Sequence, residues 1–184
     1  MIDNDLLLCD TGSVIDRILI DTLNFKSKAL AERWLEQIKS SQHLKFHNTL
    51  TEAELLAING SVYPQLGRFL EHGIDRSILG DYFVRMGKGG VERGFPLSET
   101  VYGLRITQQI ILEYMESEFV LDNPVALYQT LSVIPKVADF FVLGCFYLNK
   151  GFQEATIEKM CAVDKISKDL LTKYFKDDFF YKKE

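Results

Sequence analysis

The pattern of apolar and polar positions along the chain is that of successive amphipathic helices. Apolar residues recur three and four positions apart, as Leu30, Trp34 and Ile38 do, which is the spacing of one helix face. No run of alternating positions with turn residues on both sides indicates a strand. We therefore expect an all-α bundle in one domain over residues 1–184. About seven helices are predicted, over residues 13–23, 26–40, 51–72, 75–86, 97–119, 124–149 and 153–176.

Local signals indicate where the 51–72 helix begins and where it weakens. Thr51 and Glu54 have the spacing of a capping box, in which the two side chains satisfy exposed backbone donors at a helix start. Asn59 and Gly60 are expected to weaken or interrupt the 51–72 helix.

Glycine and proline predict the ends of the later helices. The four glycines between Gly87 and Gly94 are expected to end the 75–86 helix. Pro135 lies inside the 124–149 helix, where it should bend the helix or split it in two. We expect Gly151 to close that helix and residues 153–176 to form a separate, amphipathic one.

Charge and composition argue against a nucleic-acid-binding, secreted or membrane-spanning protein. The 26 acidic and 21 basic residues give a net charge of −5, which argues against a nucleic-acid surface because such a surface clusters Lys and Arg. Residues 1–5 carry acid where a secretory signal peptide carries base, so we expect a cytoplasmic protein. Pro135, Lys136 and Asp139 interrupt the most apolar stretch, so we expect no membrane span.

No arrangement of residues predicts catalysis. His43 and His47 are four apart, but Leu44 stands where a metalloprotease helix carries its general-base Glu. The glycines from Gly87 lack the spacing of a phosphate-binding loop, and no GxSxG motif occurs. We expect a non-enzymatic protein without a metal site. The cysteines also form no CxxC pair: they are Cys9, Cys145 and Cys161.

Several polar side chains stand on helices that are otherwise apolar. Tyr102, Arg105 and Gln109 fall three and four apart in the 97–119 helix, so they share one face. Arg68 and His72 form a second pair four apart. Burying a guanidinium without a partner is costly, so each arginine must reach solvent, an acidic residue or a bound anion. A solvated face with internal ion pairs and an anion-binding site both remain open. The acidic residues available to Arg105 are Glu99, Glu113 and Asp139.

The 124–149 helix carries a concentration of aromatic side chains. They suit the lining of a tunnel for an acyl chain, while a tightly packed core is the default interpretation. About ten buried methylenes at roughly 0.8 kcal/mol each would offset the association entropy, while Arg105 or a similar donor held the carboxylate. The aromatic residues are Phe140, Phe141, Phe146 and Tyr147, and Cys145 lies among them.

Three segments of the chain together resemble a known pattern: residues 63–70, the glycines between Gly87 and Gly94, and residues 95–105. It is similar to that of globin-like, haem-less sensor domains in bacterial stress and sporulation signalling. Within these, the chain resembles the small stand-alone sporulation-inhibitory proteins that are similar to the sensor domain of a sporulation histidine kinase. The resemblance covers most of residues 25–150 and rests on helix order and on the glycine-then-Pro-Leu junction. The charged helix from residue 153 departs from relatives fused to an output domain.

The resemblance implies a dimeric, non-haem globin fold that binds a fatty acid in an apolar tunnel and a halide ion in an adjoining polar chamber. The aromatic 140–147 segment and the Tyr102, Arg105 and Gln109 face are compatible with those two chambers. We therefore expect a sensor that inhibits sporulation by competing with a homologous histidine kinase for signal or pairing. The alternatives are a haem globin with His72 as ligand and a plain helical interaction module.

Overall fold

The computed structural model describes residues 14–72, 76–118 and 124–164. All of its regular elements are helical, which confirms the predicted all-α class for the described residues. In chain order these are α1 (Val14–Phe25), α2 (Ser27–Ser40), the 3-10 turn η1 (His47–Thr49), α3 (Glu52–Gly60), α4 (Val62–His72), α5 (Arg76–Arg93), α6 (Leu97–Glu118) and α7 (Pro124–Asp164).

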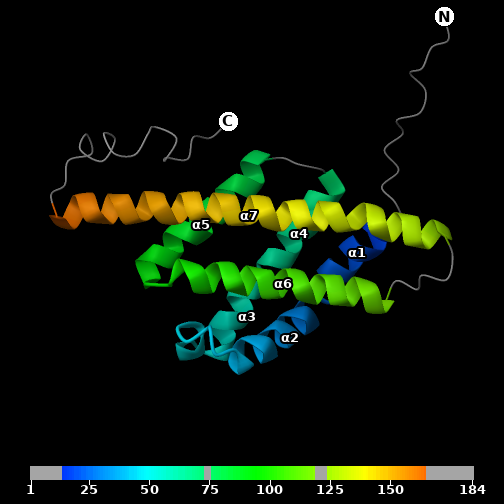
Figure 1. Cartoon of the computed structure of the whole chain (residues 1–184), viewed down its shortest axis with the longest axis horizontal. Coiled ribbons are helices and arrows are strands. Elements are labelled where there is room, and N and C mark those ends of the chain that lie inside the picture. Colours follow the sequence, from blue (N-terminus) through cyan, green and yellow to red (C-terminus); the bar gives the residue numbers. More distant parts are fainter. Residues whose placement is uncertain (1–13, 73–75, 119–123, 165–184) are drawn as a thin grey trace, which may run out of the picture.

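The long helix α7 organises the other helices. It spans the width of the molecule in Figure 1, with α6 beside it, and α5 crosses it in the most extensive helix–helix contact of the structure. Helix α1 packs on α4, and α2 packs on α3 and α6. The core lies between these layers, where Phe83 and Phe140 are fully buried.

Two of the predicted helix boundaries are confirmed. The Thr51 hydroxyl accepts the backbone N–H of Glu54, and the Glu54 carboxylate accepts the backbone N–H of Thr51, so the capping box starts α3 as expected. The predicted interruption at Asn59 and Gly60 is also present, because α3 ends at Gly60 and α4 begins at Val62.

The prediction that the glycines after residue 86 end a helix is wrong for three of the four. Helix α5 runs through Gly87, Gly89 and Gly90 and ends at Gly94, which has a φ of 77°. The N–H groups of Gly94 and Phe95 bond back to the carbonyls of Val91 and Gly90, which is a Schellman cap. The earlier glycine Gly87 serves packing instead, since a Cβ there would overlap the Leu148 carbonyl of α7.

The predicted division of the last part of the chain into two helices is also wrong. Helix α7 is continuous over 41 residues, so Pro135 does not split it and Gly151 does not close it. Pro135 lies on an exposed side of the helix. Proline has no N–H to donate to the carbonyl of Leu131, four residues earlier, and water can donate to that carbonyl instead. Gly151 lies against the Val84 backbone of α5, where a larger residue would clash. The predicted residues 165–176 lie outside the described part.

Helix α7 is unusually apolar for its degree of burial. Its Leu127–Ala162 stretch has the length and composition of a helix able to cross a membrane, with a mean hydropathy of 1.6, and 33% of that apolar window is buried. One such helix is weak evidence for a membrane span, so the expectation that none is present stays a prediction. The low burial means that much of the apolar surface of α7 is uncovered.

Candidate functional site

An open groove of about 1000 Å³ lies between α6 and α7. Its α6 wall repeats at helical spacing through Leu97, Val101 and Leu104, so one face of the helix supplies it. Its lining is mostly apolar with polar groups among it. The residues concerned are Leu97, Ser98, Val101, Tyr102, Leu104, Arg105 and Gln108 of α6, and Phe141, Val142, Cys145 and Asn149 of α7.

The α7 wall is uncharged at neutral pH. Burial raises the pKa of the Cys145 thiol, so this cysteine stays protonated and contributes an apolar surface. The Asn149 side chain donates to the Cys145 carbonyl at 2.7 Å, which ties its amide to the helix. Phe141 is buried while Val142 is exposed, so the wall runs from the core out to solvent.

Arg105 is the charged residue of this groove. Its side chain is exposed, and it makes no hydrogen bond or ion pair with another described residue. Two of its expected acidic partners are engaged elsewhere, since Glu99 binds His47 and Glu113 binds Arg33 at 2.8 Å. The guanidinium therefore meets solvent at the groove, in position to bind an anion.

The predicted face of Tyr102, Arg105 and Gln109 is divided between two depressions. Gln109 donates to Glu113 at 2.8 Å and lies in a second, polar pocket of about 590 Å³. Tyr102 lines both depressions, and the His43 ring packs edge-on against it at 5.7 Å. The other residues of the polar pocket are Gln37, Ser40, Ser41, Gln42 and Ile106.

The predicted aromatic lining is mostly core. Phe140 is fully buried, and its ring meets Phe69 and Phe83 at 5.5 Å and Phe141 at 5.1 Å in edge-on contacts. The groove therefore passes beside this cluster, and of the predicted aromatic residues it takes Phe141. Phe146 is half exposed on the outer side of α7.

The second predicted pair is not brought to the groove. Arg68 is exposed on α4, away from the groove lining, and the side chain of His72 lies outside the described part of the structure. Among the described residues that line the groove, none is a histidine. The groove thus unites Tyr102, Arg105, Phe141 and Cys145 of the predicted set.

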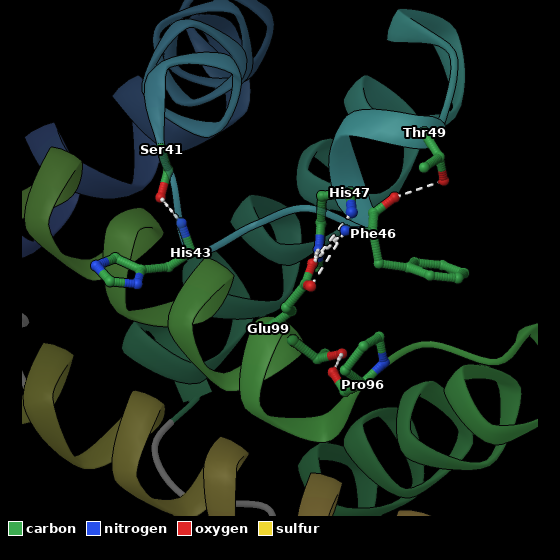
Figure 2. A network of polar contacts seen from close by, with 8 residues as sticks. Ser41, His43, Phe46, His47, Thr49, Pro96 and Glu99 are labelled. Atoms are coloured by element: carbon green, nitrogen blue, oxygen red, sulfur yellow. Dashed lines mark hydrogen bonds and ion pairs between the residues drawn. The ribbon is translucent and has the colours of Figure 1, made fainter.

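The start of α6 is anchored by the pair of a buried histidine, His47, and a partly buried glutamate, Glu99, which sequence reasoning missed. Figure 2 shows the Glu99 carboxylate between the His47 ring and the backbone of the preceding loop. Glu99 accepts from His47 Nδ1 at 3.0 Å and from the backbone N–H groups of Phe46 and His47 at 3.0 and 3.1 Å. Burial opposes its ionisation, but these hydrogen bonds outweigh burial and lower the pKa of Glu99.

Neighbouring contacts fix the same end of α6. The Trp34 indole donates to the Gly103 carbonyl at 3.0 Å, and the Trp34 and His47 rings both pack close to Gly103. The helix that supplies one groove wall is therefore held from behind by α2 and η1. A glutamate in the first turn of the predicted 97–119 helix was the available signal for this anchor.

Within residues 14–72, 76–118 and 124–164, no three His, Cys, Asp or Glu side chains are grouped closely enough to hold a metal ion. No protein-family model, curated protein or solved structure matches the chain. The groove has to be interpreted from its own chemistry.

Proposed function

We propose that this chain is a non-enzymatic sensor that binds a fatty-acid-like amphiphile in the α6–α7 groove. The observation that carries the proposal is the exposed Arg105 guanidinium beside a mostly apolar lining. An acyl chain fits the apolar wall of Val101, Leu104 and Phe141, and a carboxylate fits the arginine.

The size of the groove supports a ligand of this class. About 1000 Å³ is at the upper end of small-molecule sites, so a long acyl chain can lie along the helices. Because the groove is open, only part of the roughly 0.8 kcal/mol per methylene is gained. A dissociation constant in the micromolar range, about 8 kcal/mol, is the expectation.

The role of Arg105 is to orient the ligand. Because the guanidinium is exposed to solvent, its hydrogen bonds to a carboxylate replace bonds to water and add only about 1 kcal/mol. The apolar wall therefore supplies most of the affinity, and Arg105 supplies the preference for an acid over an alcohol of equal length.

The output is expected to pass through another protein. The finer proposal, inhibition of sporulation by competition with a homologous sensor histidine kinase, rests on the sequence resemblance and on helix order. A halide in an adjoining polar chamber belongs to that same proposal. The second, polar pocket shares Tyr102 with the groove, and a halide ion is to be sought there.

The test is calorimetric titration of the purified protein with hexadecanoate and with hexadecanol. We expect hexadecanoate to bind in the micromolar range and Arg105→Gln to weaken it about five- to tenfold while leaving hexadecanol unchanged. Arg68→Gln is the matched control, because it removes an exposed arginine outside the groove. Absence of hexadecanoate binding, or an equal loss in both variants, would reject the proposal.

The two alternatives give different results in the same preparation. A haem globin would develop a Soret band on haem addition, and the band would be lost in His72→Ala. A plain interaction module would bind neither lipid.

A further inference from the structure

Helix α7 has an apolar face that nothing else in the described structure covers. Six large side chains on it are exposed by 37% to 75%. An aromatic side chain presents about 150–250 Å² and an aliphatic one somewhat less, so the exposed fractions of these six leave on the order of 600 Å² open. That is the upper limit of the largest apolar patch on an ordinary monomer. The six are Leu127, Tyr128, Leu131, Ile134, Val142 and Phe146.

The centre of this face has a symmetric spacing. Relative to Ala138, Ile134 and Val142 lie four residues before and after, and Leu131 and Cys145 lie seven before and after. Leu127 and Asn149 complete the set at eleven. At 100° per residue all seven fall within about 40° of one line along the helix, and none is charged.

The two halves of this face differ in shape. The first half, around Leu131 and Ile134, is a ridge of exposed aliphatic side chains. The second half, at Val142, Cys145 and Asn149, is the wall of the α6–α7 groove. A ridge and a groove at equal distances from one point are complementary under a two-fold rotation about that point.

We propose that α7 pairs antiparallel with α7 of a second copy about a two-fold axis near Ala138, so that the ridge of each copy fills the groove of the other. Leu131 of one copy then meets Cys145 of the second, and Ile134 meets Val142. This helix-in-groove arrangement uses anchors three and four residues apart. The small side chain of Ala138 lets the helices approach at the axis. With the groove walls included, the buried area approaches the roughly 800 Å² per partner of a stable interface.

A second copy fits this face better than a bilayer does. Interfacial helices carry Lys and Arg along their polar side, which attracts anionic lipid. Here the charges beside the face are of both signs: Asp139, Lys150, whose ammonium lies 5.1 Å from the centre of the Phe146 ring, and Arg105 at the groove. Lys136 lies on the other side of the helix and binds Asp16 at 2.9 Å. The chain as a whole is acidic, with a net charge of −5. The inference goes beyond the proposed function and does not depend on ligand binding.

In the proposed dimer, Asp139 weakens the association of the two copies. It lies beside the apolar line, one residue from the axis, so in the antiparallel arrangement the two Asp139 carboxylates stand on the same side close together. Like charges there oppose association. Asp139→Asn therefore tightens the dimer several-fold, a gain that a misfolded variant would not produce.

The first experiment is sedimentation equilibrium of the full chain. We expect a dimer at micromolar concentration, about 100-fold weaker in Leu131→Glu, because a carboxylate would be buried without a partner. Ile78→Glu is the control, since it alters an equally exposed apolar residue on α5. Unchanged circular dichroism establishes that both variants fold. A wild-type monomer at 100 µM, or flotation of that monomer with phosphatidylcholine–phosphatidylglycerol vesicles, would overturn the inference.

The second experiment fixes the direction of pairing. Leu131→Cys, in a background with Cys9→Ser and Cys161→Ser, should form a covalent dimer through Cys145 on mild oxidation. Replacing Cys145 with Ser should abolish the cross-link. A cross-link that survives this replacement joins residue 131 of one copy to residue 131 of the second, which places residue 131 at the axis and would overturn the proposed register. Ile78→Cys in the same background should form none.

Discussion

His47 Nδ1 lies 3.0 Å from Glu99 Oε2, although the two residues are 52 positions apart in the chain. An ionised carboxylate can only accept, so His47 Nδ1 carries the hydrogen and donates it. Two backbone N–H groups of the same loop share this acceptor. The position of the first turn of α6, and with it one groove wall, depends on this one carboxylate.

Glu99→Gln should lower the free energy of unfolding by about 2 kcal/mol, because an amide cannot accept three hydrogen bonds as strongly as a carboxylate. Urea denaturation followed by circular dichroism measures this loss. Glu92→Gln, an exposed glutamate of α5, is the control and should change stability by less than about 0.5 kcal/mol. Equal stability of the two variants would contradict a structural role for Glu99.

The same carboxylate predicts how stability depends on pH. The pKa of Glu99 is lower in the folded chain than in the unfolded one, so its contribution is fully present above the unfolded value of about 4.3. That contribution is lost as the pH falls through the folded value. Wild-type stability should therefore decline more steeply than that of Glu99→Gln below about pH 4.5. Parallel curves from pH 6 to pH 3 would count against this assignment.

Gly151→Ala should destabilise the protein by more than about 2 kcal/mol, because its Cβ would overlap the Val84 backbone and force α5 and α7 apart. Helix propensity predicts the opposite sign, a gain of up to about 1 kcal/mol. Gly89→Ala is the matched control: its Cβ meets only the end of the Arg93 side chain, at 3.9 Å, so it should show that gain. Thermal melts of the two variants decide the point.

Bound amphiphile and second copy should exclude each other, since both are proposed to occupy the same groove. Saturating hexadecanoate should raise the apparent dimer dissociation constant, and dilution of the protein below that constant should raise the apparent affinity for hexadecanoate. Sedimentation with and without the lipid tests the first half. A dimer constant that saturating lipid leaves unchanged would show that the two do not share the groove, and would reject the placement of one of them there.

Local sequence signals predicted those parts of the fold that depend on neighbouring residues. The Thr51 capping box and the break at Gly60 are interactions within a few positions, and both are present. The glycines were misinterpreted because a helix stop and a close helix crossing use the same residue. Only the position of α5 against α7 distinguishes Gly87, which serves packing, from Gly94, which ends the helix.

The candidate site was predicted in part for the same reason. Helical spacing placed Tyr102 and Arg105 on one face of α6, and both line the groove. That face is wider than the groove, so Gln109 falls in the neighbouring pocket. Phe140 differs from Phe141 by one position, about 100° around the helix, which turns it into the core. The Glu99–His47 pair joins distant segments: Glu99 is recognisable in the first turn of the predicted helix, but no local pattern identifies His47 as its partner.

Because α7 is continuous, a small tilt of this helix displaces its far end by a larger distance than the part near α5. Its 41 residues form a rod about 60 Å long, held close to α5 at Gly151. The distance along the helix from Gly151 to Pro124 is about 40 Å, so a tilt of about 3° about Gly151 moves the Pro124 end by about 2 Å. A ligand that displaces the groove wall slightly near Cys145 would therefore shift the distant ridge at Leu131 further. Small events at the groove would become larger displacements where a partner binds.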